Sequence, residues 1–205
     1  KLAKKINGEI INADSMQTFK ELKILTVRPK IKDYKKIKHH LYGFISVKKN
    51  FSSGDWLKLV KKKILEINKR KKIPILVGGT GLYFKALTQG LVNIPNIPLK
   101  FRNKIRSLNK NIGSRNFYTK LLKLDPLVKN RINIHDTHRA IRAYEVKLYT
   151  KKSIYEWFKM TKSDFEENDF YKIHIDFPRD RLIKRISERA IMMFKKGVIK
   201  EVKKF

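Results

Sequence analysis

The chain has 205 residues, of which 41% are hydrophobic, and it contains no cysteine, which excludes disulfides, thiolate metal sites and a cysteine nucleophile. Its net charge of +32 favours a polyanionic partner, although lysine enrichment in an AT-rich genome would raise the charge in the same way. No apolar run reaches the roughly 18–20 residues of a membrane span, and no signal-peptide pattern opens the chain. We therefore expect a cytoplasmic protein that does not use a membrane.

The first residues predict the end of a helix followed by a short strand. Residues 1–7 have helical spacing, Gly8 is expected to end this helix, and residues 9–13 (EIINA) predict a strand. A chain that opens inside a helix suggests a missing beginning. Asp14 and Ser15 follow directly at the carboxyl end of the strand, which is where ligands bind in open parallel sheets.

Two histidines and a helix come next. His39 and His40 are adjacent, so their side chains diverge, and no carboxylate stands at metal-ligand spacing; packing or hydrogen bonding is the expected role. Ser52-x-x-Asp55 has the form of a capping box and opens a helix to about Lys69. One face of this helix is apolar and is expected in the core: Trp56, Val60, Ile64 and Ile67.

The segment Ile73–Gly90 combines a strand, a glycine turn and a helix. Residues 73–77 (IPILV) predict a strand buried on both faces, and Gly90 is expected to stop the helix. The turn 78–81 (GGTG) presents backbone N–H groups that suit an anion. On the local pattern alone, Thr80 is more simply an N-cap of the helix.

Beyond Leu91 the pattern becomes helical. Residues 93–98 are a linker, and no strand is predicted between Pro98 and Met160. Several residues are expected to cap the short helices of this region: Ser114, Asp125, Asp136 and Ser153. Residues 171–177 alternate apolar and polar side chains, which predicts a strand, and a last helix is expected to direct Leu182, Ile186, Ala190 and Met193 to a core.

Several of these segments together resemble one known family. The stretch LVGGTGLYFKALTQGL (76–91), the tetrapeptide 14–17 (DSMQ), the turn 26–29 (TVRP) and the stretch 136–146 (DTHRAIRAYEV) are similar to motifs of the tRNA dimethylallyltransferases, the IPP transferase family. A final match is Arg-x-x-x-Met-x-x-x-Gly-x-x-x-Glu-Val at 189–202. The chain departs from the family at Glu21 and Leu25, where glycines are usual, and at Arg28, where lysine is usual.

The resemblance implies an α/β fold: a P-loop-NTPase-like parallel sheet core interrupted by an all-helical insertion. Residues 1–95 and 169–205 would form the core, and residues 96–168 would form the tRNA-binding insertion. It also implies the reaction, which is transfer of a dimethylallyl group from dimethylallyl diphosphate to N6 of the adenine 3′-adjacent to the anticodon, in tRNAs reading codons that begin with U.

The reaction assigns roles to individual side chains. The N6 amine is a poor nucleophile, so a carboxylate must accept its proton, and Asp14 is the candidate base, with a metal ligand or a loop cap as open alternatives. The resemblance implies that Thr80 lies beside the acceptor base. It further implies a tRNA-binding set and a diphosphate-binding set. The first contains Asp14, Ser15, Met16, Gln17, Arg102, His138, Arg139, Ala140, Ile141 and Arg142, and the second contains Thr26, Arg28 and, by a weaker match, Arg189.

One expected motif does not occur in the chain. The phosphate loop GxxxxGK[ST] is absent, which fits a start truncated just before residue 1, and the resemblance implies C-terminal helices that this sequence does not include. No metal ligand is identified in the remaining residues. The expected partners are tRNA, through its anticodon stem-loop, and dimethylallyl diphosphate, with Mg²⁺ as cofactor and a monomeric protein.

Three alternatives remain open at this point. A related enzyme that prenylates free adenine nucleotides would not need the helical insertion or Arg139 and Arg142. A non-catalytic RNA-binding fragment would hold RNA and form no product. A small-molecule kinase on the same fold is less favoured, because no segment resembles a phosphoryl-acceptor site.

Overall fold

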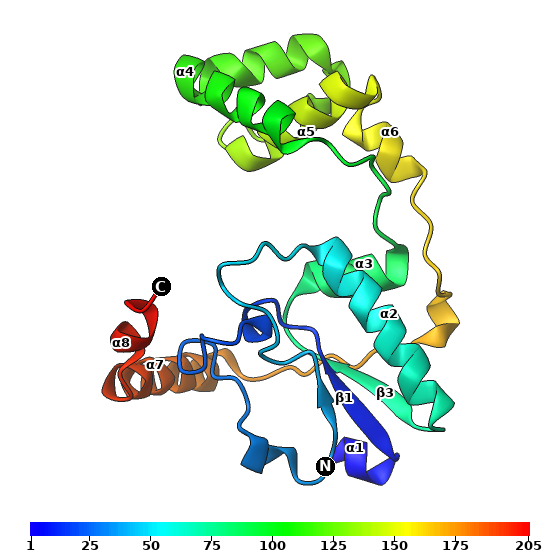
Figure 1. The fold of residues 1–205 in the computed structure, drawn as a ribbon, viewed down its shortest axis with the longest axis vertical. Coiled ribbons are helices and arrows are strands. Elements are labelled where there is room, and N and C mark those ends of the chain that lie inside the picture. The colour runs from blue at the N-terminus through cyan, green and yellow to red at the C-terminus, as the bar shows by residue number, and fades with distance from the viewer. The chain divides into compact units, whose positions relative to one another are not determined.

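A computed structural model describes all residues, 1–205, and divides them into two compact units (Figure 1). Unit 1 consists of residues 1–88 and 164–205, and it contains the sheet. Unit 2 consists of residues 89–163 and contains only helices. The elements of unit 1 are α1 (Leu2–Lys5), β1 (Gly8–Asn12), η1 (Met16–Thr18), η2 (Ile31–Tyr34), β2 (His39–His40), α2 (Ser53–Lys69), β3 (Ile73–Val77), α3 (Gly81–Gln89), η4 (Glu167–Asp169), α7 (Arg179–Lys195) and α8 (Val198–Val202). Those of unit 2 are α4 (Leu99–Leu124), η3 (Pro126–Val128), α5 (Thr137–Thr150) and α6 (Ile154–Lys159).

The sheet of unit 1 is parallel and has the order β2–β1–β3. Ile10 at its centre lies opposite His39 of β2 and Ile75 of β3. Parallel strands need crossover connections, and α2 lies in the one that leads from β2 to β3, on opposite sides of β1. The predicted α/β class with a parallel sheet is confirmed. The prediction that β3 is buried on both faces is wrong, because β3 is an edge strand here and both of its terminal residues are exposed.

Alternation along β1 explains how the core of unit 1 forms. Ile11 and Ala13 lie on the same side of the strand and pack against α2 and α3. The predicted capping box of α2 is confirmed, with Ser52 accepting from the Asp55 N–H and Asp55 accepting from the Ser52 N–H. The predicted apolar face of α2 is also confirmed as buried: Trp56, Val60, Ile64 and Ile67.

A buried carboxylate closes the other end of β1. Glu9 is 1% exposed and accepts hydrogen bonds from Arg70 Nη2 and His40 Nε2, each at 2.7 Å, with Lys72 Nζ at 3.5 Å. Burial raises the pKa of Glu9, but Arg70 and His40 outweigh that effect and lower the pKa to about 2. Hydrogen bonding by His40, which we predicted in place of metal binding, is confirmed.

The C-terminal segment of unit 1 differs from two expectations. Residues 171–177 form no strand, since no neighbouring strand pairs with them, and Tyr171 and Ile175 are 93% and 84% exposed. The predicted core face of α7 is exposed as well, with Leu182 and Ile186 at 43% and 49%, because α7 packs mainly on α8. Both corrections have one cause: alternation and helical periodicity show which side chains share a face, but not whether another element covers it.

Unit 2 follows the predicted helical pattern closely. Gly113, with φ of 76°, breaks α4 into two helical stretches, and the second carries the buried Phe117 and Leu121. Asp125, Asp136 and Ser153 cap η3, α5 and α6 as predicted. α4 and α5 enclose one core that includes Ile105, Phe117, Leu121, Val128, Ala140 and Ala143.

Candidate active site and nucleic-acid interface

The carboxyl ends of β1 and β3 meet at the glycine turn. The Ala13 N–H donates to the Val77 carbonyl at 2.8 Å, and the Thr80 N–H donates to the Ala13 carbonyl at 3.2 Å. A side chain at Gly78 would approach the Ala13 carbonyl carbon to 2.2 Å, so only glycine permits this contact. Hypothetical side chains at Gly79 and Gly81 meet nothing within 4 Å. The turn is therefore closed against β1 at Gly78 and open at the two later glycines.

Thr80 reaches across this junction to the end of β1. Its Oγ1 accepts from the Ser15 N–H at 2.9 Å and donates to Ser15 Oγ at 3.2 Å. The helix α3 begins instead with the Thr80 carbonyl, which accepts from the Tyr83 N–H at 2.9 Å. The expectation of a side-chain N-cap is thus wrong: the Thr80 hydroxyl contacts Ser15 because the two strands end side by side.

Asp14 is held in place by the turn that it opens. Its Oδ1 accepts from the Met16 N–H at 2.8 Å and the Gln17 N–H at 3.4 Å, so the loop-cap role is present. Fully buried Asn12 accepts from the Asp14 N–H and donates to the Asp14 carbonyl, at 3.0 and 2.8 Å. Oδ2 has no hydrogen-bond partner in the structure, so this oxygen is available to accept a proton.

Two tyrosines lie close enough to Asp14 for its charge to affect their phenols. Burial raises the pKa of Tyr42 to about 12, with smaller contributions from the charges of Tyr34 and Asp14. Burial also raises the pKa of Tyr83, again assisted by the Asp14 charge. Tyr83 stacks on Trp56 with ring centroids 4.2 Å apart. Both phenols therefore stay protonated at neutral pH, and the surroundings of Asp14 contain aromatic surface.

The turn predicted to contact diphosphate is tied to the same segment. Gln17 Nε2 donates to the Thr26 carbonyl at 3.0 Å. The Arg28 guanidinium lies over Gly43 and donates to the Phe19 carbonyl at 2.9 Å. Arg28 thus stabilises the loop in this structure, and its contact with diphosphate stays a prediction. Arg189 lies exposed on α7 and forms no ion pair in the structure.

The residues of this chain do not form a Mg²⁺ site by themselves. No group of three or more His, Asp or Glu side chains converges anywhere in residues 1–205. Asp14 offers one unengaged carboxylate oxygen, whereas Mg²⁺ requires six oxygens in near-octahedral geometry.

In unit 2, a buried carboxylate holds two of the predicted tRNA-binding arginines. Glu145 of α5 is 1% exposed, and its Oε2 accepts from Arg102 Nε of α4 at 3.3 Å and lies 3.5 Å from Arg142 Nη1. Its Oε1 is buried and has no partner. The arginine side chains are 37% and 41% exposed, so each guanidinium is anchored on one side and accessible on the other. Sequence reasoning matched Glu145 within the stretch 136–146 but assigned it no role.

The other residues predicted to bind tRNA divide into exposed and buried positions. Arg139 is 77% exposed and pairs only with Asp136 at 3.3 Å, and His138 is exposed beside it. Ala140 is 2% exposed, and Ile141 packs partly against the same core. α5 therefore presents His138, Arg139 and Arg142 outward and uses Ala140 and Ile141 for packing.

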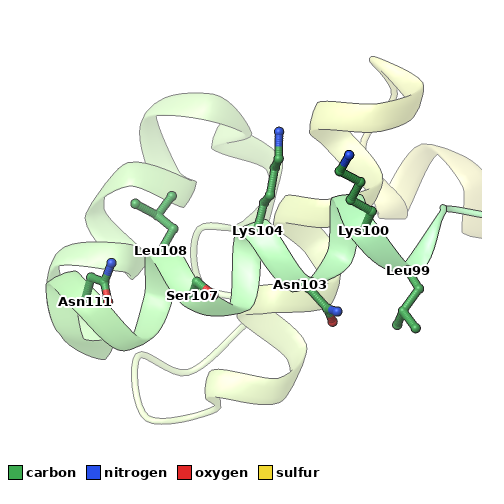
Figure 2. Close-up of a pocket in the computed structure, with 7 residues that line it drawn as sticks. All are labelled: Leu99, Lys100, Asn103, Lys104, Ser107, Leu108 and Asn111. Atoms are coloured by element: carbon green, nitrogen blue, oxygen red, sulfur yellow. The ribbon is translucent and has the colours of Figure 1, made fainter.

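An open hollow of about 760 Å³ runs along the first half of α4 (Figure 2). Lys100 and Lys104 extend from the helix in the same direction, while Asn103, Ser107 and Asn111 supply amide and hydroxyl groups. No acidic residue occurs between Leu99 and Asn111. This face has the positive charge and the hydrogen-bonding groups of a surface that binds a nucleic-acid phosphate backbone.

The fold and the strand-end junction define an α/β protein with a candidate ligand site at the carboxyl edge of a parallel sheet. A family model described as IPP transferase matches residues 17–205, and the chain belongs to this family. None of its helices is both long enough and apolar enough to cross a membrane.

Curated relatives and solved structures agree with this placement. The chain is 58% identical over its whole length to a tRNA dimethylallyltransferase of Pelagibacter ubique and 46% identical, over 98% of its length, to one of Rickettsia massiliae. It spans 66% and 56% of those proteins.

A eukaryotic dimethylallyltransferase described as acting on tRNA matches with 28% identity and a TM-score of 0.83, over 99% of this chain and 50% of that one. The tRNA isopentenylpyrophosphate transferase of Bacillus halodurans matches with 32% identity and a TM-score of 0.62, over 99% and 63%. The P-loop-like α/β class is confirmed by these neighbours.

Proposed function

We propose that a protein containing this chain modifies tRNA by transferring a dimethylallyl group to N6 of the adenine 3′-adjacent to the anticodon. The observation that carries the proposal is the junction of Asp14, Ser15 and Thr80 in a chain of the IPP transferase family. Relatives named tRNA dimethylallyltransferase support the same reaction. The expected substrates are tRNAs reading codons that begin with U, and the protein would act as a monomer in the cytoplasm.

The junction offers the acceptors that an exocyclic amine needs. An adenine N6 amine has two N–H donors. Asp14 Oδ2 has no partner, and Thr80 Oγ1 keeps one lone pair after its two contacts with Ser15. We assign the proton-accepting role to Asp14 and the positioning of the amine to Thr80. Ser15, Met16 and Gln17 form the adjoining turn on which the acceptor nucleotide would lie.

The bond changes follow from these roles. The N6 lone pair attacks the terminal allylic carbon, the bond from that carbon to the diphosphate oxygen breaks, and the N6 proton passes to Asp14. Diphosphate leaves with its negative charge, for which the open glycine turn and the segment Thr26–Arg28 supply N–H groups and a guanidinium. Mg²⁺ bound with the diphosphate remains part of the proposal, and it would further neutralise the leaving group.

Unit 2 supplies the groups for the RNA. Arg102 and Arg142, anchored on Glu145, and exposed Arg139 present guanidinium groups that suit phosphates of an anticodon stem-loop. These contacts fix register and orientation rather than base identity. The acceptor adenine would be swung out of its stack to reach the strand ends of unit 1.

Competition between two acceptors tests the proposal against an enzyme for free nucleotides. We expect a labelled dimethylallyl group to enter an anticodon stem-loop, and excess AMP to leave the rate unchanged. Incorporation into AMP with none into the stem-loop would contradict the proposal. Binding of the stem-loop that weakens with salt, without any transfer, would favour a chain that only binds RNA.

A further inference from the structure

Glu201, near the end of the chain, contacts the backbone of residues 23–25. Its carboxylate accepts from three successive backbone N–H groups of the loop before Thr26. Oε1 accepts from Lys23 at 2.8 Å and Ile24 at 2.9 Å, and Oε2 accepts from Ile24 at 3.0 Å and Leu25 at 2.9 Å. Lys23 and Glu201 are 178 positions apart in the sequence, so the bond joins two distant parts of the chain.

The surrounding backbone directs Glu201 to this loop. Gly197, with φ of 83°, ends α7 and begins α8, and the Glu201 N–H donates to its carbonyl at 3.1 Å. Burial raises the pKa of Glu201, but the three N–H donors and the Arg28 charge outweigh it, so the pKa is lowered. The group is therefore a carboxylate at neutral pH, and both of its oxygens are engaged.

The loop held by Glu201 continues into the candidate site through a short series of hydrogen bonds. Leu25 is followed by Thr26, whose carbonyl accepts from Gln17 Nε2 at 3.0 Å. The Gln17 N–H in turn donates to Asp14 Oδ1 at 3.4 Å. A shift of the loop would thus change the support of the turn that orients Asp14.

We propose that Glu201 is a positioning residue, which holds residues 23–25 and thereby sets both the Thr26–Arg28 turn and the orientation of Asp14. The inference rests on the proposed function for its consequence in catalysis. Glutamine at this position has the same size but only one acceptor, and its NH₂ group would face a backbone N–H. Glu201→Gln therefore keeps the volume while it removes the charge and one of the two acceptor oxygens.

Amide hydrogen exchange tests the positioning directly. Ile24 and Leu25 have Glu201 as their only hydrogen-bond acceptor in the structure, so Glu201→Gln and Glu201→Ala should raise their exchange rates about tenfold or more. The amides of Met16 and Gln17, which donate to Asp14, should also exchange faster. Glu188→Gln on exposed α7 is the matched control and should change neither pair. Glu201→Asp keeps the charge and should restore part of the protection.

Steady-state kinetics tests whether the Glu201 contact affects the site or only stabilises the loop 23–25. We expect Glu201→Gln to raise the KM for dimethylallyl diphosphate about tenfold while the Kd for the stem-loop stays within about twofold. Wild-type exchange rates at Ile24 and Leu25, or a change confined to those two amides, would overturn the inference. If the unaltered protein transfers no prenyl group, the proposed function fails, and the exchange rates still decide whether Glu201 positions the Asp14 turn.

Discussion

The backbone N–H of Ser15 donates to Oγ1 of Thr80 at 2.9 Å, although 65 positions separate the two residues. This bond joins the end of β1 to the turn after β3 and brings the proposed proton acceptor and the proposed amine-positioning hydroxyl to one edge of the sheet. The contact depends on a hydroxyl at position 80, so substitutions that remove or keep this hydroxyl should have different effects.

Thr80→Val should lower both stability and activity, whereas Thr80→Ser should retain most of each. Valine has the shape of threonine but leaves the Ser15 N–H without its acceptor, which should lower the free energy of unfolding by about 1–3 kcal/mol. Urea unfolding and the rate of prenyl transfer measure the two effects. A Thr80→Val variant as stable and as active as the unaltered protein would show that the hydroxyl at position 80 is not needed.

Gly78→Ala and Gly79→Ala should have opposite consequences. A side chain at Gly78 meets the Ala13 carbonyl at 2.2–2.3 Å, so Gly78→Ala should destabilise the protein by about 1–3 kcal/mol. Gly79→Ala meets nothing and should fold normally, but it should slow transfer if a substrate approaches the open turn. Thermal unfolding and the KM for dimethylallyl diphosphate distinguish the two. Wild-type kinetics in a well-folded Gly79→Ala variant would remove the turn from the proposed substrate site.

Arg139 and Arg142 should respond differently to substitution by alanine. Arg139 is exposed, so Arg139→Ala should change stability by less than about 0.5 kcal/mol and reduce the salt slope of RNA binding by about 1. Arg142→Ala should weaken RNA binding and also destabilise unit 2, because buried Glu145 loses one of its two cations. Filter binding over a series of salt concentrations, with unfolding curves, tests the pair. Identical salt slopes for wild type and Arg139→Ala would argue against a phosphate contact.

The pKa of Glu9 predicts how stability depends on pH. The folded-state pKa is lowered from 4.5 to about 2, so its contribution is complete above the unfolded value and is lost as pH falls through that interval. Glu9→Gln should reduce the free energy of unfolding at neutral pH by about 3 kcal/mol, because Arg70 and His40 lose their charged partner. The variant should also show a shallower loss of stability in acid. Parallel pH profiles of the two proteins would contradict this account.

The sequence predicted those features that depend on local spacing. The capping boxes at Ser52 and Ser153 and the helical face around Trp56 follow from spacing along the chain, and the meeting of the strand ends at Ser15 and Thr80 follows from the rule for parallel strands. The features that it missed are non-local. A strand at 171–177 requires a partner strand, and the contact of Glu201 with Ile24 requires the chain to return from its far end.

The roles of the site residues are a separate matter from their positions. Structure brings Asp14, Ser15 and Thr80 together and ties Gln17 to Thr26, but the assignment of base and positioning group stays a prediction. Glu145 belongs to a motif that the sequence analysis matched, but the motif alone does not show which residues it contacts. Its carboxylate holds Arg102 and Arg142, a relationship that spacing within one helix cannot reveal for a residue on α4.

The role of Asp14 as proton acceptor is tested by the rate and position of modification with Asp14→Asn beside the unaltered protein. Asparagine can still accept from the Met16 N–H, so the fold and stem-loop binding should persist, while loss of the proton acceptor should slow transfer about 100-fold or more. Mass spectrometry of digested tRNA should find the dimethylallyl group on N6 of the adenine 3′-adjacent to the anticodon. An Asp14→Asn protein that modifies this position at the normal rate would contradict the proposed role of Asp14.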